Sequence, residues 1–274
     1  MKSIAMTTGN DLSGRIVLVT ITAALAITAW AATPQPPAYR EAIQGTTVNF
    51  DMVLVPQGTI TVSGAPVAVG PFYIGKTEVT WDMYDVFALG LDSPKAQAAG
   101  VDATARPSNP YGAPDYGWGH AGYPVISVTR QAAEAYAKWL SQKTARVYRL
   151  PTEAEWLHAA RLAAGADGLS ADEREALAWH RGNAASHTHP VGTKAADGLG
   201  LFDLFGNATE WVMTEGPALV TRGGSFRDGA EDVGPSARPV QDEYWNERDP
   251  QLPKSRWWLS DGPFAGFRLV STVK

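Results

Sequence analysis

The segment RGGSFRDGAED, residues 222–232, brings two arginines and several carboxylates close together in the sequence. Asp228 and Glu231 are candidate general bases, because a carboxylate at the floor of a pocket can accept a proton from a substrate. Arg222 and Arg227 are candidate ligand-binding residues, because guanidinium groups form charge-assisted, bidentate hydrogen bonds. The same pattern is typical of a solvated loop held together by ion pairs, so the sequence leaves both interpretations open.

A second segment, LFDLFGNATEW at residues 201–211, places Asp203 and Glu210 inside a strongly apolar run. Burying a charge is costly unless the group is paired or coordinates a metal. The two acids therefore either lie at an ordinary turn, where they are hydrogen-bonded or solvated, or contribute oxygens to a bound cation. Calcium prefers such hard oxygen ligands, including the backbone carbonyls of a tight loop.

The tail SRWWLSDGPFAGFRLV, residues 255–270, contains Trp257 and Trp258 in tandem. Adjacent indole rings can line a slot for a planar or sugar ligand, with an arginine stacked on them. Large aromatic side chains are also common in protein cores, and we expect one of the two to be buried. Arg268 is expected to form a structural ion pair rather than to contact a ligand.

Two histidines, His187 and His189, stand at positions i and i+2 in SHTH. On a strand such residues share one face, which suits zinc, iron or copper. The sequence offers no third ligand at a fitting spacing, so a surface loop is the preferred interpretation. His158 is expected to pack within a helix.

Four helices are predicted from apolar spacing and from residues suited to their N-termini. Their expected N-caps are Thr80, Thr129, Thr152 and Ser170. The last two stand three residues before a glutamate, which is the capping-box pattern. The second helix is expected to bury Ala133, Tyr136, Ala137 and Leu140, and the third to bury Trp156, Ala159, Ala160 and Ala163.

Strands are expected mainly before the helices. FDMVLVPQGTITV, residues 50–62, is typical of a hairpin with its turn at Pro56-Gln57-Gly58, and a short strand follows in VGPFYIGKTEVT. The segment 108–124, rich in Gly, Pro and aromatic residues, is expected to be a loop, and long loops inside one domain are usually functional. From Arg181 onward no long helix is predicted. The sequence therefore indicates a single α+β domain with much irregular structure.

The composition suits one globular domain, because 45% of the 274 residues are hydrophobic and 19% are charged. The net charge is −5 and no run of Lys and Arg stands out, so nucleic acid is not an expected partner. The sequence contains no cysteine, which excludes disulfides, thiolate nucleophiles and thiolate metal ligands.

The N-terminus has the features of a signal peptide over residues 1–31. A basic flank precedes an apolar stretch from Ile16 to Ala32, and Ala29-Trp30-Ala31 matches a signal-peptidase site. We expect cleavage, a flexible leader over 32–48 and the domain over 49–274, located in the periplasm or secreted. An uncleaved anchor is the alternative, and no other segment is apolar for long enough to span a membrane.

Several phrases, in one order from about residue 50 to the C-terminus, together resemble the formylglycine-generating enzyme family, also called the sulfatase-modifying factor domain. They are MVLVPQGT, FYIGKTEVTWDMY, YPVISVTRQAAEAYAKWL, RLPTEAEWLHAAR, GNATEW, RGGSF and GFRLV. The family's fold is a variant of the C-type-lectin-like architecture with little regular secondary structure. The resemblance therefore implies that fold for this chain.

The resemblance also implies a calcium ion at the GN-x-x-EW loop. By position, its ligands are the side chains of Asp203 and Glu210 and the carbonyl oxygens of Gly206 and Ala208. Family members have a second calcium loop upstream. The corresponding segment here, GNAASHTHPVGTKAADG, is poor in acids and offers Asn183 as its candidate ligand, so we expect one structural calcium.

The sequence departs from the family at the catalytic centre. The formylglycine-generating enzyme uses two cysteines after RGGS to bind copper and activate oxygen. Ser225 matches the family's serine and is a further catalytic candidate, but Asp228 stands at the first cysteine position and Val233 near the second. Neither side chain replaces a thiolate for Cu(I), so formylglycine formation by that copper mechanism is excluded.

Among relatives on this scaffold, the exported, cysteine-free format resembles the pyoverdine-maturation proteins more closely than the ergothioneine-pathway sulfoxide synthases, which need a separate iron domain. This resemblance implies oxidative or tailoring chemistry on a periplasmic small molecule or peptide. The alternatives are a non-catalytic lectin-like binding module and an accessory protein of the cell envelope. Catalysis predicts a deep pocket at Asp228 or Glu231, binding predicts an exposed aromatic groove, and an accessory role predicts a large apolar patch.

Overall fold

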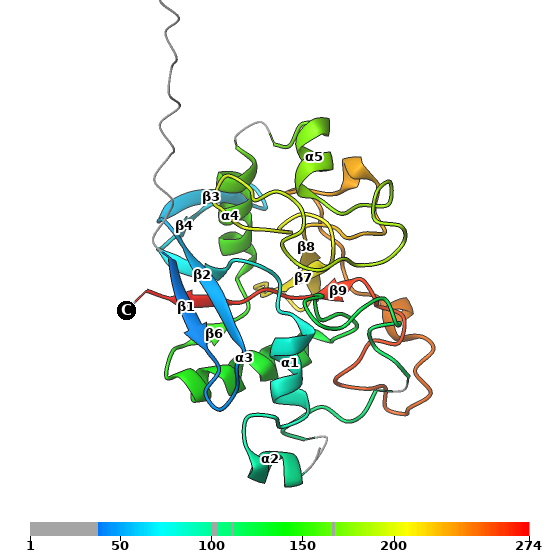
Figure 1. Ribbon diagram of the computed structural model, residues 1–274. Coiled ribbons are helices and arrows are strands. Elements are labelled where there is room, and N and C mark those ends of the chain that lie inside the picture. The colour runs from blue at the N-terminus through cyan, green and yellow to red at the C-terminus, as the bar shows by residue number, and fades with distance from the viewer. Residues whose placement is uncertain (1–37, 100–103, 111, 166–167, 274) are drawn as a thin grey trace, which may run out of the picture. The chain divides into compact units, whose positions relative to one another are not determined.

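The two ends of the described chain meet in one antiparallel sheet. The computed structural model describes residues 38–99, 104–110, 112–165 and 168–273, and the predicted signal peptide over 1–31 lies outside them. The sheet has the strand order β1-β2-β5-β10-β6, so the last strand lies between two earlier ones (Figure 1). Its strands are β1 (Ala38–Ala42), β2 (Asn49–Val55), β5 (Phe72–Gly75), β6 (Tyr148–Arg149) and β10 (Val270–Thr272).

The first strand corrects the predicted start of the domain. β1 lies within the segment that was expected to be a flexible leader, and it pairs with β2 in a register that runs from Ala38 opposite Val53 to Ala42 opposite Asn49. An ion pair between Arg40 and Asp51 joins the two strands on their exposed side. The sequence AYREA carries no strong strand pattern of its own. The segment forms a strand because it pairs with β2.

The hairpin predicted around Pro56-Gln57-Gly58 is wrong, because β2 and β3 (Gly58–Val62) belong to different sheets. β3 pairs instead with β4 (Ala65–Val69) through a two-residue turn at Ser63 and Gly64. These residues have φ values of 50° and 83°. Positive φ at both positions matches the right-handed twist of the flanking strands, so the turn chemistry favours a hairpin here.

The predicted helix starts agree with the structure. α3 (Arg130–Thr144), α4 (Glu153–Ala164) and α5 (Ala171–Leu177) follow Thr129, Thr152 and Ser170, and these three hydroxyls accept hydrogen bonds from the helix backbone. Both predicted capping boxes form. α1 (Trp81–Ala88) follows Thr80, whose side chain makes no capping hydrogen bond. A short helix that the sequence pattern does not indicate, α2 (Pro94–Ala99), follows α1.

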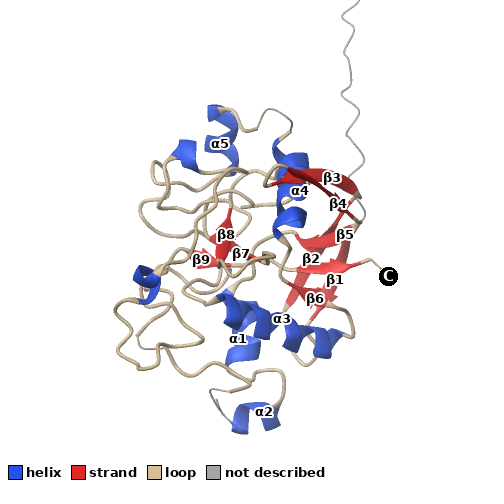
Figure 2. Ribbon diagram, turned by 180° about the vertical axis from the view of Figure 1, so that it is seen from behind, coloured by secondary structure: helices blue, strands red, loops and turns tan. Residues whose placement is uncertain are grey.

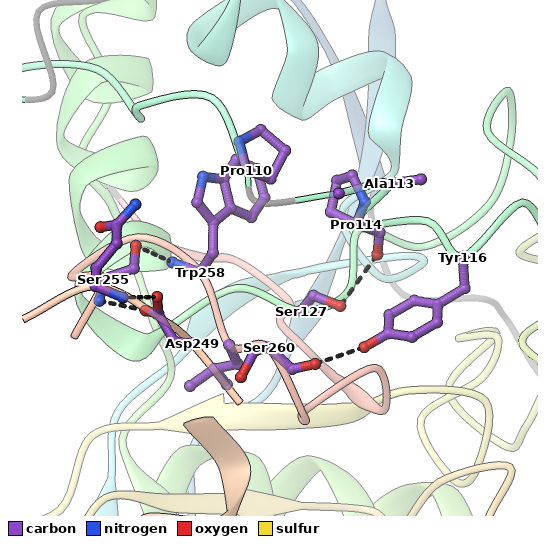
Figure 3. A pocket seen from close by; sticks show the side chains of 12 residues that line it. Pro110, Ala113, Pro114, Tyr116, Ser127, Asp249, Ser255, Trp258 and Ser260 are labelled. Carbon is purple, nitrogen blue, oxygen red and sulfur yellow. Dashed lines mark hydrogen bonds between the residues drawn. The ribbon is translucent and has the colours of Figure 1, made fainter. Parts of the chain in front are cut away.

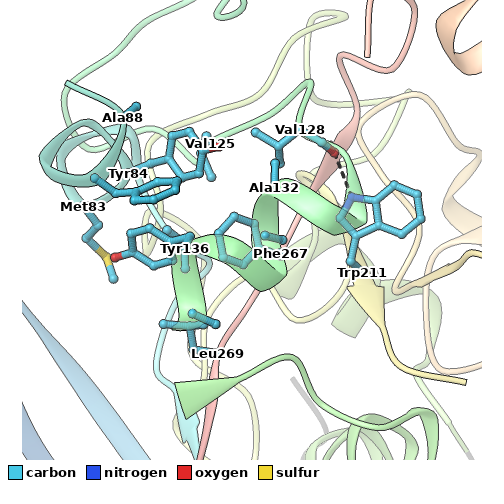
Figure 4. Packing of buried hydrophobic residues seen from close by; sticks show 14 of the residues in the cluster. Met83, Tyr84, Ala88, Val125, Val128, Ala132, Tyr136, Trp211, Phe267 and Leu269 are labelled. Carbon is cyan, nitrogen blue, oxygen red and sulfur yellow. Dashed lines mark hydrogen bonds between the residues drawn. The ribbon is translucent and has the colours of Figure 1, made fainter. Parts of the chain in front are cut away.

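The predicted apolar faces of α3 and α4 lie in two hydrophobic clusters. The α3 face packs with α1 and with the residues before β10, and Figure 4 shows Tyr136 next to both Tyr84 and Phe267. The ring centroid of Tyr136 lies 5.6 Å from each of the other two. The α4 face packs against strands of the large sheet and against the 199–205 segment. Packing in these two clusters holds α3 and α4 in position, and the loops extend from these helices.

The second half of the chain is mostly loop, as predicted. β7 (Thr209–Val212), β8 (Val220–Arg222) and β9 (Ala265–Gly266) form a small sheet, and the described helices after Arg181 are short 3-10 segments at Ala230–Asp232 and Glu243–Asn246. Figure 2 shows the loops gathered around this small sheet, away from the five-stranded sheet. None of the described helices combines the length and apolarity needed to cross a bilayer. The result is one mixed α+β domain.

Candidate functional site

A buried ion pair stands at the centre of the expected calcium loop. Glu210 Oε1 accepts a hydrogen bond from Arg268 Nε at 2.9 Å and lies 2.8 Å from Arg268 Nη2 in the ion pair. Glu210 Oε2 accepts a second hydrogen bond, from Trp156 Nε1 at 2.8 Å. Arg268 also donates to the carbonyl oxygens of Gly75 and Phe202. The expectation that Arg268 is structural is therefore confirmed.

Two more buried carboxylates lie close to this pair. Glu78 accepts hydrogen bonds from Asn207 Nδ2 and from the Ala208 amide, each at 2.9 Å. Burial, together with the charges of Asp203 and Glu210, raises the pKa of Glu78 well above its ordinary value. Burial also raises the pKa of Asp203 to about 6. One guanidinium, that of Arg268, thus interacts with the charges of three buried carboxylates, which leaves an excess of negative charge unless a proton or a cation is bound.

Of the two acids predicted to bind calcium, Asp203 has a side-chain oxygen without a hydrogen-bond partner, whereas both oxygens of Glu210 have one. Asp203 Oδ2 accepts the Gly192 amide at 2.7 Å, whereas Oδ1 is buried without a hydrogen-bond partner. Gly206 has a φ of 77°, and a Cβ there would come within 2.3 Å of the Trp179 carbonyl oxygen, so this tight loop requires glycine. Glu210, in contrast, is already neutralised by Arg268, which takes the role expected of calcium at that side chain.

The arginine at the start of the 222–232 segment is a structural residue, which corrects its predicted role in ligand binding. Arg222 Nη2 contacts Glu153 Oε1 directly, and Arg238 Nε donates to the same oxygen at 2.6 Å. Arg222 is buried and its Nη1 reaches the carbonyls of Pro235 and Ala237. Because these partners occupy the guanidinium, it is not presented to a ligand.

The predicted catalytic trio does not form the floor of a pocket. Asp228 Oδ2 accepts the Ser225 amide at 2.7 Å and the Ser225 hydroxyl at 2.9 Å, so the two residues close a local turn. Ser225 is buried, Asp228 is half-buried and Glu231 is exposed. The main cavities among the described residues are lined by other segments. The deep pocket at Asp228 or Glu231 that catalysis would require is not among these cavities, and the catalytic roles of Ser225, Asp228 and Glu231 stay predictions.

Arg227 is the arginine of this segment that remains exposed. Its guanidinium lies over the rings of Phe226 and Phe264, with the carbon atom Cζ 5.6 Å and 5.0 Å from the two centroids. Phe226 in turn contacts Trp118, with their centroids 5.2 Å apart. This packing connects the 222–232 segment with the long 108–124 loop.

The tandem tryptophans do not form an exposed aromatic groove. Trp257 is 2% exposed and packs beside Phe87, with a centroid separation of 6.4 Å. Trp258 is 8% exposed and its Nε1 donates to the Ser108 carbonyl at 2.7 Å. Each of the two nevertheless lines a cavity: Trp257 lines one beside α3, and Trp258 lines another where a small ligand could reach it.

That cavity lies between the 108–116 and 249–260 loops and has a volume of about 80 Å³. Figure 3 shows Trp258 and Pro110 at one end and Tyr116 at the other, with Ser127 between them. The Tyr116 hydroxyl donates to the Ser260 carbonyl at 2.8 Å, which ties the two loops together. The cavity is lined by Pro110, Gly112, Ala113, Pro114, Tyr116, Ser127, Asp249, Gln251, Ser255, Trp258, Leu259 and Ser260.

Sequence reasoning missed the polar residues of this cavity. Asp249 is 6% exposed, and its carboxylate accepts the amides of Gln251 and Ser255 at 2.9 Å and 2.6 Å. Ser127 has a φ of 63° and donates to the Pro114 carbonyl at 3.0 Å. The available signal was the long 108–124 segment, but nothing in the sequence shows which distant residues it would face.

The histidine pair is part of a ring stack. The His189 ring lies on Trp179 with a centroid separation of 3.7 Å, and His187 lies 4.6 Å from His189. His189 Nε2 bonds to the Ala184 carbonyl and His187 Nδ1 to that of Thr188. Asn183, the candidate for a second calcium, accepts the His180 amide at 2.9 Å. Within the described ranges, no three His, Asp or Glu side chains converge as metal ligands would.

Comparison with known proteins agrees with the motifs. Residues 40–273 match the sulfatase-modifying factor enzyme 1-like domain. Over 109 residues the chain is 38% identical to the formylglycine-generating enzyme of Mycobacterium tuberculosis. This match covers 35% of this chain and 34% of that enzyme's length. Treponema denticola variable protein 1 has a similar solved structure, with a TM-score of 0.63, 21% identity, and coverage of 87% of this chain and 100% of its own.

PvdO from Pseudomonas aeruginosa also has a similar solved structure. Its TM-score is 0.57 at 22% identity, and the match covers 88% of this chain and 100% of PvdO. At such low identities these two structures share the fold, and the family follows from the match over residues 40–273. The chain belongs to the sulfatase-modifying factor enzyme 1-like domain family.

Proposed function

We propose that this protein is an exported ligand-binding module of the sulfatase-modifying factor fold, which captures a small molecule or a peptide group in the cavity of Figure 3. The proposal depends on one contrast. The carboxylates of the 222–232 segment are bonded within their own loop or exposed, whereas Asp249 and Trp258 are buried and line a cavity. Binding sites are typically concave and apolar with a few placed polar groups, and this cavity has that character.

Export is supported by the signal-peptide features of residues 1–31. A binding role is also consistent with the missing cysteines, because the copper centre of the formylglycine-generating enzyme depends on them. A structural calcium near Asp203 is part of the proposal, supported by the unpaired buried Oδ1. The ion would stiffen the loop before β7 and would take no part in ligand recognition.

The second candidate function is tailoring chemistry on a small molecule or peptide. The observation that favours it is the 38% identity with the mycobacterial formylglycine-generating enzyme over 109 residues. Arg227 would then be the exposed residue most suited to hold an anionic part of the substrate. A chemical change in the bound molecule, detected as a mass shift, distinguishes this function from binding alone.

The proposed function is tested by closing the cavity. Ala113 is exposed at the cavity rim, so Ala113→Trp should fill the space without disturbing the core. Ala121→Trp is the matched control, because Ala121 is exposed on the same loop but does not line the cavity. A compound library is screened by thermal shift, since a ligand that binds the folded state raises its melting temperature. Hits abolished by Ala113→Trp and retained by Ala121→Trp support the proposal; hits that survive both variants contradict it.

A further inference from the structure

Among the twelve described residues that line the cavity between the 108–116 and 249–260 loops, one is charged. That residue is Asp249, and the others are apolar, aromatic or neutral polar. A carboxylate that is 6% exposed loses most of its hydration and needs compensation from hydrogen bonds or a cation. The site therefore carries a local negative charge inside a mainly apolar wall.

Hydrogen bonds compensate Asp249 only in part. Its oxygens accept the amides of Gln251 and Ser255, and a weak contact of 3.4 Å from Asn246 Nδ2. A carboxylate offers about four acceptor directions, so at least one is left. Lys254 is close, but its Nζ donates to the main-chain carbonyls of Glu247 and Asp249, at 2.7 Å and 2.6 Å, rather than to the carboxylate.

Among the described residues, two other buried acids, Glu153 and Asp92, have the cationic partners that Asp249 lacks. Glu153 is paired with Arg222 and Arg238, and Asp92 with Lys143 and Arg106. Within the described part of the chain, Asp249 has no such cationic partner in an ion pair. A positive group that enters from solvent would supply one.

Aromatic rings complete the environment of a cation. Trp258 lines the same cavity, and its indole is stacked on Trp81 with a centroid separation of 6.4 Å and an interplanar angle of 23°. Tyr116 provides a second ring at the far end (Figure 3). Organic cations are attracted to the faces of Trp and Tyr, and a carboxylate beside such rings is a recurring arrangement for ammonium groups. Anionic ligands would be repelled by Asp249.

We infer that this cavity binds a compact organic cation, an ammonium or guanidinium group, between the Asp249 carboxylate and the ring of Trp258. The inference rests on the proposed binding function and specifies its ligand class. A volume of about 80 Å³ admits one such head group and little more. The group belongs either to a free amine or to a Lys or Arg side chain of a peptide, and both have the same recognition chemistry.

The experiment compares a cation with its neutral isostere. Choline and 3,3-dimethyl-1-butanol have the same branched shape, but only choline is charged. We expect choline to bind at least about tenfold more tightly, measured by titration calorimetry or by tryptophan fluorescence. A free lysine-containing tripeptide and its acetyl-lysine analogue form the second arm, and tighter binding of the tripeptide than of choline identifies a peptide as the source.

Two variants test whether the preference for choline over the alcohol arises in this cavity. Asp249→Asn should reduce choline affinity to that of the alcohol while leaving the alcohol unchanged. Because this change could disturb the 249–255 loop, Ala113→Trp provides a second test, and it should abolish binding of both compounds. Equal affinity for choline and the alcohol, or preferred binding of an anion that Ala113→Trp blocks, overturns the cation inference but leaves the binding function intact. No cavity-dependent ligand at all overturns the binding function itself.

Discussion

Arg268 Nη2 lies 2.8 Å from Glu210 Oε1, and the two side chains are 0% and 1% exposed. The pair joins β7 to the segment between β9 and β10, and the same guanidinium reaches the carbonyls of Gly75 and Phe202. The Arg268 side chain thus links its own segment to Gly75 and to the 202–210 segment. The pair therefore adds a side-chain link between β7 and loops that have little regular secondary structure.

Removing the positive partner should be strongly destabilising. Arg268→Met leaves Glu210 buried without its counter-ion, and breaking such a buried pair typically costs about 3–5 kcal/mol of folding free energy. Adding Glu210→Gln should restore part of the loss, because the uncompensated charge is then absent. Thermal and urea unfolding of the single and double variants measures both effects.

The matched control for that prediction is Arg40→Met. Arg40 pairs with Asp51 across β1 and β2, but its side chain is 67% exposed. Exposed ion pairs contribute about 0–1 kcal/mol, so this variant should melt close to the parent protein. Equal losses for Arg40→Met and Arg268→Met would show that the buried pair has no special role.

A calcium ion at Asp203 makes a distinct prediction. If the unpaired Oδ1 is a ligand, EDTA should lower the melting temperature of the parent protein, and Asp203→Asn should both lower it and remove the response to EDTA. The calcium concentration at half-effect gives the affinity. The comparison is made at pH 8, where the carboxylate is ionised.

If no cation binds at Asp203, the stability of the protein should depend on pH in a different way. Burial raises the pKa of Asp203 to about 6, so without a cation the folded state holds the proton more tightly than the unfolded chain does. Stability then falls as the pH rises from the ordinary Asp pKa of about 4 toward 6. In that case Asp203→Asn would be neutral or stabilising at pH 8 and insensitive to EDTA, and the calcium prediction would fail.

The helix starts could be predicted from the sequence because their signals are local. Thr152 and Glu155 are three residues apart, and their reciprocal hydrogen bonds form within one turn whatever the rest of the chain does. Strand pairing is different. β1 is ordered by β2, and β10 completes a sheet whose other strands lie more than a hundred residues earlier, so no local pattern identifies either partner.

The contacts of the candidate site could not be predicted from local sequence patterns either. Arg222 and Glu153 stand 69 residues apart, so the charge pattern near Arg222 could not reveal that the guanidinium is already occupied. The cavity joins Tyr116 to Ser260 across 144 residues, and its acid, Asp249, lies in a stretch with no distinctive motif. The family motifs identify the scaffold, whereas the lining of a cavity depends on contacts between loops.

The turn formed by Ser225 and Asp228 should be structural. Asp228→Ala removes the acceptor of two hydrogen bonds, from the Ser225 amide and hydroxyl, and should cost about 1–2 kcal/mol of stability. Glu231→Ala is the control, because Glu231 is exposed and such changes usually remain within about 0.5 kcal/mol. Ligand binding in the cavity should survive both. If Asp228→Ala leaves stability unchanged yet abolishes the conversion of a substrate, Asp228 is a catalytic base after all.

His120 should make the cavity wall sensitive to pH. Its Nε2 lies 2.7 Å from Asp85 Oδ2 of α1, and its Nδ1 lies 2.9 Å from Asp115 Oδ2 of the 108–124 loop. The imidazole also stacks on Trp81, with a centroid separation of 5.0 Å. Burial opposes protonation of the ring, but the hydrogen bonds and charges of the two aspartates outweigh it and raise the pKa of His120.

The sign of the effect follows from that raised pKa. The folded state holds the His120 proton more tightly than the unfolded chain does, so the contribution to stability is complete below the ordinary His pKa of about 6.5 and is lost as the pH rises through the raised value. His120→Gln keeps polarity without the titration. The melting temperature of the parent should therefore exceed that of His120→Gln by more at pH 6 than at pH 9. A difference that stays constant over this range would mean that His120 holds the loop as a neutral ring, through stacking on Trp81 alone.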